Sequence, residues 1–230
     1  MPDRVPDRAP DVIDASEVAR RLAALRQRLS RAGGDGVRVV AVTKGFGPEA
    51  VAAAVGAGLL DLGENYAQEL VAKAGDCRDN PDIQPQPRWH FIGRLQRNKI
   101  RRIADLVQLW QSVDRSEVAA EIARWAPGAR VLVQVDIAST GGRGGCRPQD
   151  TARLVGDCRR AGLEVAGLMA VGRPGLPEQA RPGFRMLATQ AAELGLADLS
   201  MGMSADLEVA VEEGATIVRV GSALFGARPR

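Results

Sequence analysis

The feature that most constrains the fold is an alternation of apolar and amphipathic segments that repeats eight times along the chain. From residue 37 onward, short β-branched runs such as Val-Arg-Val-Val-Ala-Val alternate with segments whose apolar residues recur at helical spacing. Strands joined by helices in strict alternation predict right-handed crossovers and a parallel sheet. Several of the strands are almost continuously apolar, which is typical of a sheet covered by helices.

The number of units favours a closed barrel of the α/β class. Eight strand–helix units in 230 residues fit a (β/α)8 TIM barrel near the lower end of the size range of that fold. An open doubly wound sheet is the alternative, but no G-x-G-x-x-G follows the first strand and the strand count reaches eight. The expected strands are residues 37–43, 59–63, 89–92, 106–112, 131–137, 165–170, 199–201 and 216–220. The expected helices are residues 48–57, 67–74, 97–104, 115–126, 148–161, 177–194 and 205–213.

An extra helix is expected before the first strand, between residues 14 and 32. Its apolar residues recur at three- and four-residue steps, and a Gly-Gly pair ends it. The apolar face of this helix consists of Val18, Leu22, Leu25 and Leu29.

One domain is expected, and it comprises residues 14–230, this helix included. Residues 1–13 repeat Pro-Asp-Arg and are expected to be a disordered or loosely attached tail. No stretch approaches the roughly 20 apolar residues of a membrane span, and the N-terminus carries charges and prolines where a secretory signal has its apolar core. A soluble, cytoplasmic protein without membrane contact is therefore expected.

Histidine and cysteine usage excludes several kinds of site. The single histidine, His90, rules out metal sites that need two imidazoles. Cys77, Cys146 and Cys158 are odd in number and form no C-x-x-C, which fits reduced thiols better than a disulfide framework or a zinc ribbon. We expect no metal site.

The positive charge of the chain does not require a nucleic-acid partner. The formal net charge is +3, which would tolerate an anionic ligand. A basic run with aromatic residues surrounds the third expected strand and could mark RNA binding. Its helical spacing favours a solvated helix face, so no nucleic acid is expected. The run comprises Arg88, Arg94, Arg97, Lys99, Arg101 and Arg102.

Lysine is rare in this chain, and Lys44 directly follows the first expected strand. An amine at the mouth of a barrel with apolar walls loses hydration, so its pKa falls and it becomes a nucleophile toward aldehydes. The alternative is a lysine that extends from a strand end to water. Position alone favours neither.

Other polar and glycine-rich residues also follow expected strands and should meet Lys44 at one end of the barrel, where the active sites of this fold are built. The segments after strands seven and eight suit an anion held by backbone N–H groups. Ser204 taken alone is better explained as a helix N-cap. Arg219 needs a partner if it is buried, either a ligand or a structural ion pair. A structural role is favoured for His90, and ordinary ion pairing for Glu64 and Glu69.

Several long motifs together resemble one family. The resemblance spans about residues 37–228 and is to the pyridoxal phosphate homeostasis protein family, whose fold is similar to the N-terminal barrel of alanine racemase. The motifs are V-A-V-T-K at 40–44, L-G-E-N-Y-A-Q-E at 62–69, W-H-F-I-G-R-L-Q-R-N-K at 89–99, S-V-D at 112–114, G-L-M-A at 167–170, L-S-M-G-M-S-A-D-L-E at 199–208 and V-R-V-G-S-A-L-F-G-A-R at 218–228.

The resemblance implies a site for pyridoxal 5′-phosphate, with Lys44 as the Schiff-base partner. Arg219 would face the pyridine nitrogen. Because arginine keeps its proton, it would favour the unprotonated pyridine ring, which is then a weak electron sink. The phosphate would lie among Ser204, Gly221 and Ser222, and the ring would be lined by Asn65, His90 and Met169.

The resemblance also implies a carrier for cofactor homeostasis and delivery, without evident catalytic turnover. The expected partners are the small-molecule cofactor and, transiently, pyridoxal phosphate-dependent apoenzymes, and the protein is expected to be a monomer. No second domain is expected to supply an opposing base, although an amino-acid racemase or lyase using the same cofactor remains the alternative. The chain departs from the family at the rim, where S-K-T-K becomes T-K-G-F at 43–46 and K-S-G becomes R-G-G at 143–145.

Overall fold

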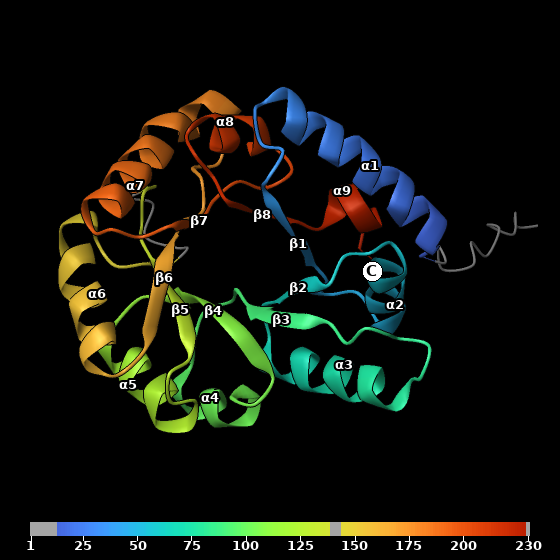
Figure 1. The fold of residues 1–230 in the computed structure, drawn as a ribbon, viewed down its shortest axis with the longest axis horizontal. Helices are drawn as coiled ribbons and strands as arrows, with labels where there is room; N and C mark the ends of the chain where they lie inside the picture. Colours follow the sequence, from blue (N-terminus) through green and yellow to red (C-terminus); the bar gives the residue numbers. More distant parts are fainter. Residues whose placement is uncertain (1–12, 139–143, 229–230) are drawn as a thin grey trace, which may run out of the picture.

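The computed structural model describes residues 13–138 and 144–228. Eight parallel strands form a closed barrel in chain order, β1 to β8, with β8 paired to β1 (Figure 1). The expected (β/α)8 TIM barrel is confirmed. The strands are β1 Arg38–Val42, β2 Asp61–Glu64, β3 Arg88–Phe91, β4 Val107–Val113, β5 Arg130–Gln134, β6 Glu164–Met169, β7 Asp198–Ser200 and β8 Ile217–Val220.

Helices surround the barrel on the outside, as Figure 1 shows. Their order follows the strands, which places each crossover next to the strands it joins. The helices are α1 Ala15–Arg31, α2 Pro48–Gly56, α3 Ala67–Asp79, α4 Arg97–Ile103, α5 Ser116–Trp125, α6 Thr151–Arg160, α7 Arg181–Glu193, α8 Leu207–Glu212 and α9 Ser222–Phe225, with 3₁₀ turns η1 Pro148–Asp150 and η2 Pro177–Ala180 before α6 and α7.

The extra N-terminal helix α1 is also confirmed. Asp14 caps it by accepting a hydrogen bond from the backbone N–H of Ser16 at 3.1 Å. The predicted apolar face is buried, and the helix packs against α2, α8 and α9. Residues 1–12 of the expected tail lie outside the described part of the chain, whereas Ile13, its last residue, is half-buried against the core and is not loosely attached.

The predicted element boundaries differ from the observed ones mainly at helix ends. Helix α3 continues to Asp79, beyond the predicted end at residue 74, and the predicted helices at 148–161 and 177–194 each begin with a 3₁₀ turn. The sequence did not predict α9, since a four-residue helix shows no apolar period.

Most apolar core lies between the sheet and the helices, and a smaller cluster fills the barrel. Side chains alternate along β8, so Val218 and Val220 join the outer core while Ile217 points inward. The same alternation places Arg219 inside the barrel, where it is 5% exposed. The interior cluster consists of Val40, Leu109, Leu132, Met169 and Ile217.

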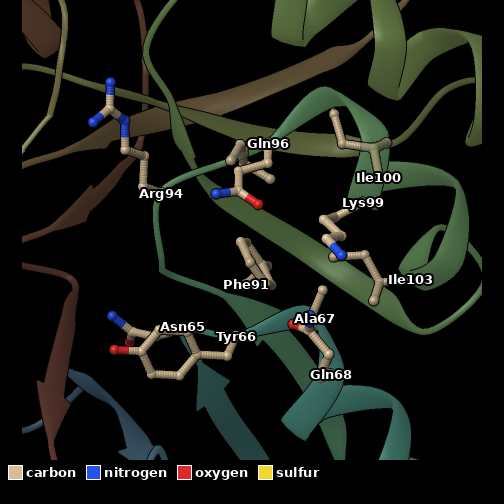
Figure 2. Close-up of a pocket in the computed structure, with 11 residues that line it drawn as sticks. Asn65, Tyr66, Ala67, Gln68, Phe91, Arg94, Gln96, Lys99, Ile100 and Ile103 are labelled. Carbon is tan, nitrogen blue, oxygen red and sulfur yellow. The ribbon is translucent and has the colours of Figure 1, made fainter.

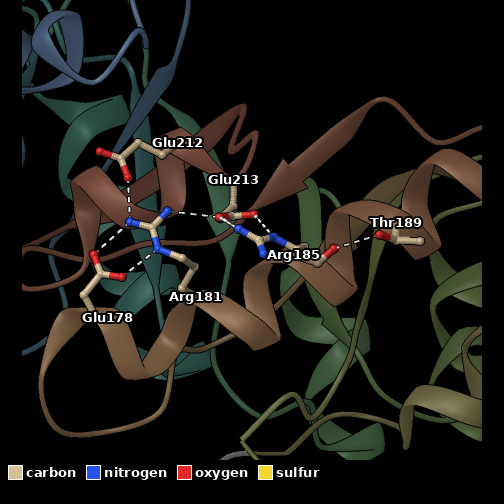
Figure 3. A network of polar contacts seen from close by, with 6 residues as sticks. All are labelled: Glu178, Arg181, Arg185, Thr189, Glu212 and Glu213. Carbon is tan, nitrogen blue, oxygen red and sulfur yellow. Dashed lines mark hydrogen bonds and ion pairs between the residues drawn. The ribbon is translucent and has the colours of Figure 1, made fainter.

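An ion-pair network fastens α7 to α8 on the outer surface (Figure 3). Arg181 contacts Glu178, Glu212 and Glu213, and Arg185 shares Glu213. Most of these contacts are exposed, that of Arg181 with Glu213 being part-buried, and they bear on helix packing rather than on the mouth of the barrel. Within residues 13–138 and 144–228, none of the helices is long and apolar enough to cross a membrane.

Candidate functional site

The carboxyl ends of the strands bring most of the expected site residues to one end of the barrel. Lys44 follows β1, Asn65 follows β2 and Ser204 follows β7. Gly221 follows β8 and lies against the end of β1, since a Cβ on it would be 3.1 Å from the carbonyl oxygen of Val42. Of the remaining expected site residues, Met169 is the last residue of β6 and Ser222 is the first residue of α9. His90 and Arg219 lie in the barrel interior.

The backbone on both sides of Lys44 is held by helix α3. Lys73 donates from Nζ to the carbonyl oxygen of Thr43 at 2.7 Å, and the N–H of Gly45 donates to Oε2 of Glu69 at 2.9 Å. Lys73 and Glu69 also form an ion pair at 3.2 Å, one helical turn apart. The backbone on both sides of Lys44 is therefore fixed by side chains of α3.

A buried carboxylate completes this cluster. Glu64 accepts hydrogen bonds at Oε1 from Lys73 and from the hydroxyl of Thr43, both at 2.6 Å. Its Oε2 is buried without a hydrogen-bond partner among the described residues. Burial raises the pKa of Glu64 above its ordinary value, against the opposing effect of Lys73. Sequence reasoning expected ordinary pairing for Glu64 and Glu69 but missed Lys73, whose signal was its rarity and its i, i+4 spacing from Glu69.

The amine of Lys44 is half-buried and has no hydrogen-bond or ion-pair partner within the described residues. Burial lowers the pKa of Lys44, and the positive charges of Arg228 and Arg219 lower it further, while Glu64 opposes them. A larger fraction of this amine is therefore neutral and nucleophilic at a given pH than for an exposed lysine.

Arg219 is a further positive charge at this end, and it has no carboxylate partner among the described residues. Its Nη1 donates to the carbonyl oxygen and the hydroxyl of Ser200, both at 2.7 Å, and its Nη2 donates to the carbonyl oxygen of Ala170 at 2.7 Å. Burial lowers the pKa of Arg219 to about 10, so it stays charged at neutral pH. Arg219 forms no ion pair within the described residues, and its three hydrogen bonds leave Nε–H and one Nη2–H for a ligand.

His90 is buried inside the barrel with both ring nitrogens in hydrogen bonds. Its Nε2 lies 3.0 Å from Oδ1 of Asp61, and its Nδ1 lies 2.7 Å from Nε2 of Gln111. This environment agrees with the structural role favoured from sequence. Contact of His90 or Met169 with a ligand ring stays a prediction.

The segments after β7 and β8 offer backbone donors. Ser222 starts α9, where the N–H groups of Leu224 and Phe225 donate to the carbonyl oxygen of Gly221 at 2.8 and 3.0 Å, which leaves those of Ser222 and Ala223 for a ligand. The expectation that Ser204 is a helix N-cap is wrong, because α8 begins at Leu207 and Asp206 occupies the cap position. Asp206 instead accepts from the N–H of Met203 at 2.7 Å, so its carboxylate shapes the turn itself and leaves the hydroxyl of Ser204 without a capping role.

A cavity of about 270 Å³ lies beside the expected site, between the loops after β2 and β3 and the helices α3 and α4 (Figure 2). Asn65 lines it, and none of the other expected site residues does. Oδ1 of Asn65 is buried without a partner in the described part of the chain. Gly93 makes this placement possible, since a Cβ there would be 2.0 Å from the carbonyl oxygen of Asn65.

The basic run around β3 is partly committed to structural contacts. Arg88 forms an ion pair with Asp61 at 2.7 Å, and Arg101 stacks on Trp125 at 4.7 Å from the ring centroid. Arg97, Arg101 and Arg102 on α4 are exposed, which agrees with the solvated helix face expected from the sequence. Arg143, one of the departures from the family pattern, lies outside the described residues, and no group of metal-ligating side chains occurs within them.

Comparison with known proteins gives consistent matches over nearly the whole chain. The alanine racemase N-terminal domain family matches residues 13–229. The pyridoxal phosphate homeostasis protein of Pseudomonas aeruginosa is 39% identical over 224 residues, which cover 93% of this chain and 95% of that protein. PipY of Synechococcus elongatus is similar in two solved structures, each covering 91% of this chain and 100% of its own. The structure without PLP has a TM-score of 0.81 and 34% identity, and the structure with PLP bound has 0.78 and 33%.

Fold and sequence match together define a barrel of the alanine racemase N-terminal class. Within that class, the chain belongs to the pyridoxal phosphate homeostasis protein family. The resemblance inferred from the motifs is confirmed.

Proposed function

We propose that the protein binds pyridoxal 5′-phosphate as a Schiff base on Lys44 and serves in the homeostasis and delivery of that cofactor, without catalytic turnover of its own. The observation that carries this proposal is a pair of positive charges at the carboxyl end of the barrel, Lys44 and Arg219, that have no hydrogen-bonded or ion-paired carboxylate among the described residues. Buried or half-buried charges without counter-ions are unfavourable, so the site suits an anionic ligand.

The donor set also fits an aldehyde-bearing phosphate in particular. Lys44 offers an amine whose pKa is lowered by burial, and a bound aldehyde cofactor supplies an electrophilic carbon for such an amine. Arg219 has two N–H groups left for an acceptor such as an unprotonated ring nitrogen. The N–H groups of Ser222 and Ala223 at the start of α9, next to Gly221, suit the phosphate.

The relatives support the same proposal. Those in Pseudomonas aeruginosa and Deinococcus radiodurans are named pyridoxal phosphate homeostasis proteins, and PipY has a structure with PLP bound. On this chain, Arg219 keeps its proton, so it would make the ring a poor electron sink and favour holding the cofactor over carbanion chemistry. In delivery, the protein would act as a monomeric carrier that contacts apoenzymes transiently and passes the cofactor to them.

Titration with pyridoxal 5′-phosphate, followed by absorbance, tests the binding. We expect a new absorbance band with the wild-type protein and with Lys99→Ala, a lysine change beside the neighbouring cavity, and no such band with Lys44→Ala. A band of equal strength in Lys44→Ala would contradict the proposal. The absence of turnover is tested by incubating the loaded protein with amino acids in deuterium oxide. Exchange of the α-proton would favour a racemase or lyase instead.

A further inference from the structure

A chain of buried polar side chains starts at Arg219 and crosses the barrel interior. Arg219 donates to the hydroxyl of Ser200 at 2.7 Å, and that hydroxyl lies 2.6 Å from Oε1 of Gln111. The amide nitrogen of Gln111 lies 2.7 Å from Nδ1 of His90, whose Nε2 lies 3.0 Å from Asp61. We name these five residues the interior polar chain. All five are buried, at 8% exposure or less.

With the amide of Gln111 oriented as the structure has it, the hydrogen bonds of the interior polar chain run in one direction. Arg219 can only donate, so the Ser200 hydroxyl accepts from it, and the oxygen of the Gln111 amide that faces this hydroxyl accepts its proton in a hydrogen bond. The amide nitrogen of Gln111 then donates to Nδ1 of His90. Nδ1 of His90 accepts that hydrogen bond, so its Nε2–H donates to Asp61, which is the final acceptor.

The interior polar chain ends at Asp61, at the opposite end of the barrel from Lys44. Asp61 is the first residue of β2 and pairs with Arg88, the first residue of β3, at 2.7 Å. Burial alone would raise the pKa of Asp61, but the hydrogen bonds from His90 and Arg88 outweigh it and hold that pKa well below its ordinary value. The carboxylate of Asp61 at one end of the barrel is thus linked, through the side chains of His90, Gln111 and Ser200, to the guanidinium of Arg219.

The geometry points to a positioning role for Ser200, Gln111 and His90: they hold Arg219 as an oriented donor and transmit the occupancy of the site to His90. This inference rests on the proposed function, because the ligand that meets Arg219 is the proposed cofactor. Hydrogen bonds aligned in one direction polarise one another, so a new acceptor on Arg219 changes every bond down to Asp61. His90 is the single histidine of the chain and reports this change without interference.

The direction of the chain is tested on the ligand-free protein by nitrogen-15 NMR of His90. We expect a neutral imidazole protonated at Nε2. Gln111→Glu preserves size but has no N–H to donate, so Nδ1 of His90 should become protonated. A wild-type imidazole protonated at Nδ1, or an unchanged imidazole in Gln111→Glu, would overturn the inferred direction.

The transmission is tested by adding pyridoxal 5′-phosphate. We expect the Nδ1 resonance of His90 to move in the wild type and in Ser200→Thr, which keeps the hydroxyl, and to stay in place in Ser200→Ala. Loss of this acceptor should also weaken cofactor binding about tenfold. Ser112→Ala is the matched control and should behave as wild type. Ser112 is also a buried serine, but its hydroxyl donates to the carbonyl oxygen of Gly93, which is not part of the interior polar chain.

The outcomes separate the two proposals. Wild-type protein that takes up no cofactor by absorbance contradicts the proposed function and the transmission with it, while the test on the ligand-free protein still decides the direction. Wild-type protein that takes up cofactor while the His90 resonances stay fixed overturns the transmission alone. If the Nδ1 resonance of His90 moves equally in Ser200→Ala and in the wild type, the transmission is overturned as well.

Discussion

Replacing Lys73 by methionine is expected to destabilise the protein strongly, although Lys73 lies outside the expected ligand contacts. The ammonium of Lys73 is 5% exposed and binds Glu64, which is fully buried, at 2.6 Å, and the carbonyl oxygen of Thr43 at 2.7 Å. Methionine keeps the length of the side chain but removes all donors. The carboxylate of Glu64 is then a buried charge without a counter-ion.

The magnitude follows from this loss. Removing one partner of a buried ion pair costs about 3–5 kcal/mol of the free energy of unfolding, because the remaining charge is uncompensated. The double variant Lys73→Met/Glu64→Gln should recover about 2 kcal/mol, since a neutral amide carries no such charge and its oxygen can still accept from Thr43. The double variant is therefore the control for simple loss of packing.

Urea unfolding followed by circular dichroism measures both changes. Burial raises the folded-state pKa of Glu64, so its stabilising contribution is complete below the unfolded value near 4.3 and is lost as pH rises through the folded-state pKa. Lys73→Met removes the group that opposes this rise, and its deficit should grow between pH 5 and pH 7. A deficit below about 1 kcal/mol at pH 7, or a double variant no more stable than the single one, would refute the reasoning.

Three further predictions concern the mouth, the floor and the interior of the barrel. Arg228→Gln removes a positive charge that lowers the pKa of Lys44, so the pH dependence of cofactor loading, followed by absorbance, should move to higher pH; an unchanged profile would contradict this. Asp61→Asn should lose about 1.5–3 kcal/mol in urea unfolding at neutral pH. Because the folded-state pKa of Asp61 is lowered, that loss should shrink as pH falls below about 3.9, and a loss independent of pH would argue against it. Leu132→Ala opens a cavity in the interior cluster and should cost about 2–5 kcal/mol in the same assay, whereas a smaller cost would mean that the interior collapses around it.

The fold could be predicted from sequence because its signals are local. Period-two and period-3.6 patterns lie within single elements, and the buried face of α1 was predicted residue by residue. The site positions could be predicted as a group, since residues that follow parallel strands meet at one end of a barrel.

The contacts between these positions could not be predicted, because they join residues far apart in the chain. Ser200 and Gln111 are separated by 89 positions, and Lys73 and Thr43 by 30. Neither pairing leaves a pattern in either segment. Ser204 shows the opposite failure: serine is a good N-cap residue, but the turn Met203–Asp206 delays the start of α8 to Leu207 and gives the cap position to Asp206.

The position of the cofactor-bearing lysine is the central claim, and the chain allows it to be measured cleanly because lysine occurs only at Lys44, Lys73 and Lys99. The protein is mixed with pyridoxal 5′-phosphate and reduced with borohydride, and its peptides are mapped by mass spectrometry. The account predicts a pyridoxyl phosphate adduct on Lys44, with Lys73 unmodified because Glu64 and Thr43 hold its amine. An adduct mainly on Lys99 or Lys73, or no adduct after cofactor addition, would contradict it.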